Sequence, residues 1–225
     1  MTIALRADDI IVQVGDSIPA VTGSAWDSWL GWRTNVGTHF AGIGTGIKPY
    51  FINRGVPSAY VSTHQTVDNA SLIYNAKPSV LVIGLGINEA ADSIPAATFE
   101  TNLTALIHQS VRNSGTLTYA RTLIITPWFG GEPTGAYDTR IDDIATKCAT
   151  VATALGCESL DIRTTRVLTG GQTADGVHPT TAGKAWIVSQ IETKFTFDDT
   201  VATLTGPEKW RGLNRAGAGN RINTG

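Results

Sequence analysis

The stretch Ile10-Ile-Val-Gln-Val-Gly-Asp-Ser17 decides the fold, because it combines a buried strand with a polar turn. Residues 10–14 are apolar and β-branched apart from Gln13, and the apolar character is continuous rather than alternating. A continuous run of this kind is typical of a strand that is covered on both faces, as in a parallel sheet. The turn that follows places a serine hydroxyl at the carboxyl end of this strand.

Strands and helices alternate along the rest of the chain. Further apolar runs predict strands over 50–53, 80–83, 122–125 and 159–162. Helical periodicity is clearest over 141–155 and 99–111, before Gly156 and Gly115, and weaker over 24–33, 65–74 and 181–195. Alternation of this kind implies right-handed βαβ units. We therefore expect an α/β fold, a three-layer α/β/α sandwich of the flavodoxin-like kind with about five parallel strands.

Length and composition predict one globular domain. The chain has 225 residues, of which 42% are hydrophobic and 16% are charged. A chain of this length buries roughly 70% of the surface that its unfolded form exposes. We expect a domain over residues 1–197, followed over 198–225 by a tail rich in Gly, Asn and Arg that serves as a linker, a docking arm or a surface wrap.

Charge and hydropathy exclude several classes of function. The net charge is −2 and no basic block is present, which argues against nucleic-acid binding and electrostatic membrane docking. No apolar run approaches the roughly 20 residues of a membrane-spanning helix. Charged residues near the start stand where a signal peptide would be apolar, so we expect a soluble protein without a visible signal peptide. Cys148 and Cys157 are expected to be buried free thiols, about 13 Å apart along a helix.

Four polar blocks stand in a characteristic order, three after predicted strands and one near the end of the chain. They are Gly15-Asp-Ser17, Asn53-Arg-Gly55, Gly84-Leu-Gly-Ile-Asn-Glu89 and Asp175-Gly-Val-His-Pro179. In this order, over about residues 10–191, the chain resembles the SGNH (GDSL-type) hydrolases, a superfamily of esterases and lipases.

The resemblance implies a role for each matching residue. Ser17 is the nucleophile, His178 the general base and then acid, and Asp175 the group that orients the imidazole. The oxyanion hole comprises the backbone N–H groups of Ser17 and Gly55 and the side-chain amide of Asn88.

Elementary chemistry supports the same assignment. A serine hydroxyl is a poor nucleophile until a neighbouring base accepts its proton. An imidazole titrates near neutrality, so His178 can take that proton and return it to the leaving alcohol. Asp175 lies three residues upstream, and Gly176 eases the tight turn that would bring its carboxylate to Nδ1.

This chain departs from the family pattern at two positions. Ser58 stands where the second block usually has a further glycine, and Glu89 stands where the third block usually has Asp. Both departures bear on the shape of the pocket floor, and neither removes a catalytic group.

The sequence gives less support to other kinds of functional site. Gly84-Leu-Gly86 resembles part of a dinucleotide fingerprint, but Glu89 in place of the third glycine would repel a pyrophosphate. No clustered Cys/His spacing is present, so we expect neither a metal nor a cofactor. The remaining histidines and the first tryptophans are expected to be structural or surface residues: His39, His64, His108, Trp26, Trp29 and Trp32. Trp128 follows the fourth strand and could form a platform for a sugar ring or the wall of an acyl pocket.

The sequence thus predicts a serine esterase that acts through an acyl-serine. The chain shows no long apolar lid segment, which favours short acyl or carbohydrate O-acetyl esters, so the expected partner is a small-molecule or glycan ester. The alternative is a non-catalytic carbohydrate-binding or structural module of a cell-surface or virion assembly that keeps this fold.

Overall fold

A parallel five-stranded sheet forms the centre of the molecule. The computed structural model describes residues 2–6, 9–18, 50–128, 136–164 and 177–197. The strands are β2 (Ile10–Gly15), β3 (Tyr50–Gly55), β4 (Val80–Gly84), β5 (Thr122–Ile125) and β6 (Glu158–Leu160), in the order β3-β2-β4-β5-β6. All neighbours are parallel, with Gly15 opposite both Gly55 and Gly84. The predicted α/β fold is confirmed, and its first predicted strand lies next to the second and the third.

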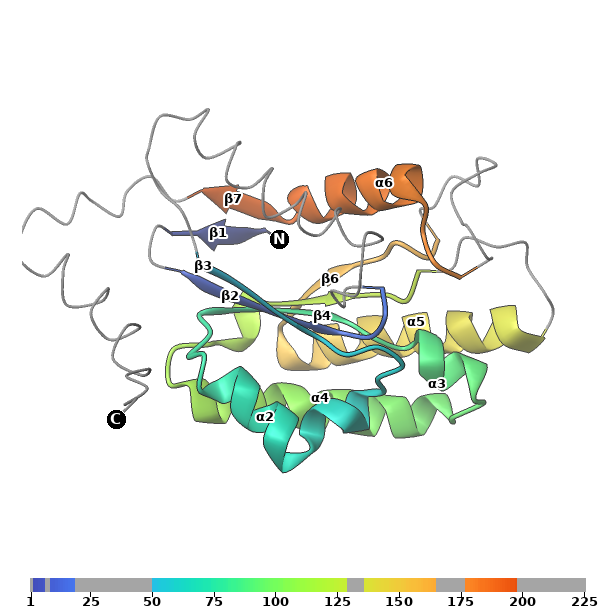
Figure 1. Ribbon diagram of the computed structural model, residues 1–225, viewed down its shortest axis with the longest axis horizontal. Coiled ribbons are helices and arrows are strands. Elements are labelled where there is room, and N and C mark those ends of the chain that lie inside the picture. Colours follow the sequence, from blue (N-terminus) through green and yellow to red (C-terminus); the bar gives the residue numbers. More distant parts are fainter. Residues whose placement is uncertain (1, 7–8, 19–49, 129–135, 165–176, 198–225) are drawn as a thin grey trace, which may run out of the picture.

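Helices cover both faces of this sheet (Figure 1). One face carries α2 (Val67–Tyr74), α3 (Ile87–Ala91), α4 (Ala96–Ser114) and α5 (Ala136–Leu155), and the other carries α6 (Thr181–Glu192). Short 3-10 helices, η2 (Val61–Gln65) and η3 (Tyr119–Arg121), precede α2 and β5. The arrangement is the three-layer sandwich that the alternation of elements predicted.

A second, smaller sheet was not predicted. β1 (Ile3–Leu5) and β7 (Phe195–Phe197) pair in parallel, and Figure 1 shows them on the same side of the main sheet as α6. The helix predicted over 181–195 therefore ends at Glu192. The helix predicted over 65–74 is likewise divided, because extended backbone at Thr66 separates η2 from α2.

The core confirms the predicted helical stripes. Phe99, Leu103, Leu106 and Ile107 of α4 are buried, as are Ile141, Ile144, Cys148, Val151 and Ala152 of α5. Gly115 and Gly156 have φ of 77° and 70°, the left-handed conformation in which glycine ends a helix. Both cysteines are free, although Cys157 is only half-buried.

Other predictions fall outside the described residues. They concern the helix over 24–33, Trp26, Trp29, Trp32, His39 and the tail 198–225. None of the helices in the described part of the chain is both long and apolar enough to cross a bilayer.

Candidate active site

Ser17 and His178 meet at the carboxyl end of β2, although 161 positions separate them in the chain. The Ser17 Oγ lies 3.1 Å from the His178 Nε2, which is hydrogen-bonding distance. His178 precedes α6, whose first turn is capped by the Thr180 side chain accepting from the Gly183 N–H. Both side chains are half-buried, so the pair is partly shielded and still reachable. A hydroxyl in this position can pass its proton to the imidazole.

Asp16 holds the turn that carries Ser17. Its buried carboxylate accepts a hydrogen bond from the Ile18 N–H at 2.8 Å, which closes a turn around Ser17. Burial raises the pKa of Asp16 to about 7, the Ile18 hydrogen bond opposes this rise, and the nearby Glu89 charge adds to it. The residue before Ser17 is thus a carboxyl group that retains its proton in mildly acidic solution.

Gly55 ends β3 directly opposite Gly15. Its backbone N–H, one of the sequence-predicted oxyanion donors, donates to the Asn53 Oδ1 at 2.8 Å. A substrate oxygen would have to replace or share that hydrogen bond in order to use the Gly55 N–H.

Ser58 offers a backbone donor that the sequence reasoning did not consider. The Ala59 N–H donates to the Val56 carbonyl at 3.1 Å, which closes a turn with Pro57 second and Ser58 third. Ser58 has a φ of 58°, and this combination is that of a type II turn, in which the third position is usually glycine. Ser58 is exposed, and its N–H has no acceptor within the described residues. The Val-Pro-Ser-Ala turn sequence is the signal that could have found it.

Asn88 lies in the first turn of α3, close to the same segment. Its Nδ2 donates to the Ala59 carbonyl at 2.9 Å. A side-chain amide carries two N–H groups, so this contact fixes the amide plane and leaves one N–H for another acceptor. Gly86 precedes the helix with a φ of 122°, a conformation that brings Asn88 close behind the end of β4.

Trp128 is 1% exposed and follows β5. It lines a cavity of about 20 Å³ together with Asp16, Ile18, Leu85 and Ile187. This volume is room for roughly one water molecule. The indole N–H has no partner in the described part of the structure. Such burial fits the wall of a small pocket and leaves no face for a stacked sugar ring.

Of the remaining residues discussed from the sequence, one lies outside the described residues and two histidines lie within them. Asp175 lies outside the described residues. His64 is buried and hydrogen-bonds through Nε2 to the Gly15 carbonyl at 3.0 Å, and burial lowers its pKa, so it is a neutral structural group. His108 is exposed and contacts the Tyr119 hydroxyl, also as expected for a residue outside the site.

Comparison with known proteins agrees with this geometry. The sequence matches the model of the GDSL-like lipase/acylhydrolase family over residues 14–186. A search of the curated proteins finds no significant match.

Several solved structures share the fold. A putative GDSL-like lipase from Parabacteroides merdae is 16% identical, with a TM-score of 0.72 over 86% of this chain and 98% of its own. A lipase/acylhydrolase from Enterococcus faecalis is 23% identical, with a TM-score of 0.62 over 81% and 93%. An acetylxylan esterase from Geobacillus stearothermophilus is 16% identical, with a TM-score of 0.66 over 90% and 100%.

Proposed function

The chain belongs to the GDSL-like lipase/acylhydrolase family, and on that premise we propose that it is a serine esterase that cleaves carboxylic esters. The observation that carries the proposal is the 3.1 Å contact between the Ser17 Oγ and the His178 Nε2. Among the described residues, no other contact joins a side-chain hydroxyl to an imidazole at the carboxyl end of the sheet.

The proposed reaction has two halves. The Ser17 oxygen attacks the ester carbonyl carbon while the His178 Nε2 takes the hydroxyl proton. The resulting tetrahedral intermediate collapses, the carbon–oxygen bond to the alcohol breaks, and His178 returns the proton to the leaving alcohol. Water then attacks the acyl-serine with the same imidazole as base, which releases the acid and the free Ser17. Asp175 is the proposed partner that orients the imidazole.

The developing oxyanion needs fixed donors. We assign the Ser17 N–H and the second N–H of the Asn88 side chain to this role. At the end of β3, the Gly55 N–H can serve only after it leaves Asn53, whereas on the segment that follows, the exposed Ser58 N–H has no acceptor within the described residues. The Ser58 amide is therefore a further candidate donor beside the predicted Gly55.

We propose short acyl or carbohydrate O-acetyl esters as substrates. The cavity beside the Ser17 turn is small, about 20 Å³, and the buried Trp128 is part of its wall. An acetylxylan esterase is among the structures that share the fold, which supports a carbohydrate ester as one class to test.

Replacement of the nucleophile is the decisive experiment. We expect Ser17→Ala to lower kcat on p-nitrophenyl acetate by about 10³-fold or more, because it removes the attacking oxygen. Ser189→Ala is the matched control, since this exposed α6 hydroxyl donates only to the Trp186 carbonyl, and its rate should be unchanged. A fluorophosphonate should label wild-type protein at Ser17. Equal rates for wild type and Ser17→Ala would contradict the proposed esterase activity and favour the alternative, a non-catalytic binding or structural module.

A substrate series addresses specificity. Acetylated sugars and p-nitrophenyl esters of graded acyl length should show kcat/KM falling as the acyl chain lengthens. A rise in kcat/KM toward long chains would contradict the proposed preference for short acyl groups.

A further inference from the structure

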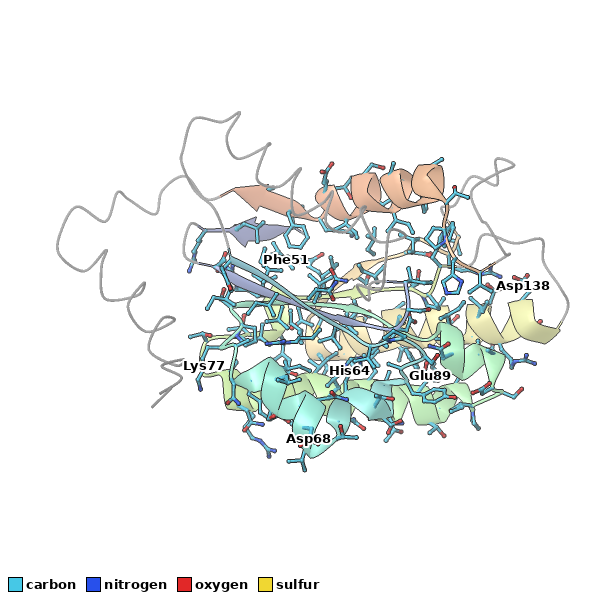
Figure 2. The ribbon with its side chains drawn as sticks, viewed as in Figure 1. Phe51, His64, Asp68, Lys77, Glu89 and Asp138 are labelled. Atoms are coloured by element: carbon cyan, nitrogen blue, oxygen red, sulfur yellow. The ribbon has the colours of Figure 1, made fainter. Side chains whose placement is uncertain are left out.

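Glu89 is a buried acidic residue that the proposed reaction does not use. It is 2% exposed and directly follows Asn88 in the first turn of α3. Its Oε1 accepts the Val61 N–H at 2.6 Å, and its Oε2 has no partner in the described part of the structure. Figure 2 shows Glu89 and His64 in the layer between the main sheet and the helices that cover it. A carboxyl group in this position costs solvation energy, so its retention calls for a specific contact.

Asn88 and Glu89 together hold one short segment of the chain. Asn88 donates to the Ala59 carbonyl, and Glu89 accepts from the Val61 N–H. Between these two contacts, the Tyr60 hydroxyl donates to Asp92 at the end of the same helix. Segment 59–61 is therefore fixed to α3 by consecutive hydrogen bonds.

The ends of the surrounding segment are tied to the nucleophile strand instead. The Gly15 carbonyl accepts from the Val56 N–H at 2.9 Å and from the His64 Nε2 at 3.0 Å. The backbone around Ser58 and Ala59 thus depends on α3 for its position relative to Ser17.

This arrangement affects the oxyanion donors directly. The hydrogen bond to the Ala59 carbonyl sets the orientation of the Asn88 amide. The position of that carbonyl depends in turn on the hydrogen bond between Glu89 and the Val61 N–H, two residues later. We propose that Glu89 is a positioning residue, which acts through Val61 and Ala59 to aim the Asn88 amide at the substrate oxygen. The inference rests on the proposed function, since it presupposes that an acyl oxygen is bound there.

The proposed role depends on the length of the Glu89 side chain rather than on its charge. Glu89→Gln keeps the side-chain length and an oxygen that accepts the Val61 N–H. Glu89→Asp keeps the charge but withdraws the carboxylate by one methylene, so the 2.6 Å contact is lost. The two variants therefore separate the two explanations.

Kinetics of these variants on p-nitrophenyl acetate test the role. We expect Glu89→Asp to lower kcat about tenfold with KM changed less than twofold, and Glu89→Gln to stay within threefold of wild type. Glu100→Asp is the matched control, because Glu100 pairs with Lys147 at the surface of α4, and its kcat should be unchanged. Val61→Pro removes the backbone N–H that Glu89 accepts. Val61 is the first residue of η2, a position where proline is tolerated, so this variant should show the same loss of kcat as Glu89→Asp. It also tests the contact independently if Glu89→Asp folds poorly.

A double-mutant cycle shows whether Glu89 acts through Asn88. Asn88→Ala should lower kcat by about 10²–10³-fold, and adding Glu89→Asp to it should cost less than a further twofold. If Glu89→Asp caused a merely structural defect, it would lower kcat by the same factor in wild type and in Asn88→Ala. That result would overturn the proposal. Loss of activity in Glu89→Gln with retention in Glu89→Asp would overturn it as well.

Hydrogen exchange separates this inference from the proposed function. Amides in residues 56–65 should exchange faster in Glu89→Asp than in wild type or Glu89→Gln. Unchanged exchange would overturn the anchor itself. Absence of Ser17-dependent turnover in wild type would contradict the esterase and with it the catalytic role of Glu89, whether or not the exchange data show the anchor.

Discussion

At the scale of single residues, the carboxyl group of Asp16, next to Ser17, has a strongly shifted pKa. Burial raises its pKa to about 7, well above the value of about 3.9 expected in an unfolded chain. Between these values the folded protein holds a proton that the unfolded chain releases. Stability from this group is therefore complete below pH 4 and is lost as the pH rises toward 7. Burial also raises the pKa of Glu89, and its contribution has the same sign.

Asp16→Asn should flatten this pH dependence, because an amide imitates the protonated carboxyl and does not titrate. We expect the free energy of unfolding of wild type to fall more steeply than that of the variant, by about 1 kcal/mol per pH unit. Urea unfolding at pH 4.5, 5.5 and 6.5 measures the two slopes. Asp68→Asn, at an exposed position on α2 that Figure 2 labels, is the control and should keep the wild-type slope. Parallel curves for wild type and Asp16→Asn would show that Asp16 is ionised throughout.

At the scale of elements, the short helix α3 depends on one glycine. A Cβ on Gly86 would lie 2.6 Å from the Ile144 Cγ2 and 3.3 Å from the Phe99 Cε2, and the φ of 122° strains any side chain. The close approach of α3 to α4 and α5 therefore requires glycine at this position, and through it the placement of Asn88 depends on this residue as well.

Gly86→Ala should destabilise the protein by about 2–4 kcal/mol, since overpacking adds to backbone strain. Gly115→Ala is a graded control, because its φ is 77° and a Cβ at this position would meet no atom within 4 Å, so only about 1 kcal/mol should be lost. Chemical denaturation of both variants gives the comparison. A Gly86→Ala variant no less stable than Gly115→Ala would mean that α3 moves aside at little cost.

The long helices and the strands of the main sheet could be predicted from the sequence, whereas the short elements α3, β1 and β7 could not. α4 and α5 have enough turns for their apolar stripes to be visible, and β2 and β4 are continuous apolar runs. α3 has five residues, and β1 and β7 have three each, which is too few for a period.

The same distinction holds in the candidate site. The blocks containing Ser17 and His178 could be found because their short motifs match the family pattern. Ser17 directly follows β2, and His178 lies just before α6. The Ser58 donor depends on a backbone dihedral angle, and the Glu89 anchor joins residues 28 positions apart. The Val-Pro-Ser-Ala sequence indicates a turn at Ser58 but not that its N–H faces the site, and the Glu89 anchor leaves no pattern in the local sequence.

At the scale of the whole molecule, the two-stranded sheet joins distant parts of the chain. Ile3 and Leu5 of β1 are buried, and β1 pairs with β7 from Ile3 opposite Phe195 to Leu5 opposite Phe197. The covering layer on this side of the main sheet therefore includes the last described residues.

Truncation tests the proposed limits of the domain. Removal of residues after Asp199 should leave kcat on p-nitrophenyl acetate unchanged and Tm within about 2 °C, since every proposed catalytic residue and β7 remain. Removal of residues after Thr193 also deletes β7 and should lower Tm by roughly 5–10 °C, because Ile3 and Leu5 lose their cover. Thermal unfolding and activity of the two truncations give the answer. A folded but inactive Asp199 truncation would show that the tail contributes to the site.

The separation of Ser17 from His178 by 161 positions also has a consequence for biosynthesis. A ribosome makes the amino-terminal part first, so the nascent polypeptide carries its hydroxyl without a base through most of translation. The contact between Ser17 and His178 can form only after the segment around His178 has left the exit tunnel and docked. Under the proposed mechanism, the growing chain therefore lacks its general base until the domain is almost complete.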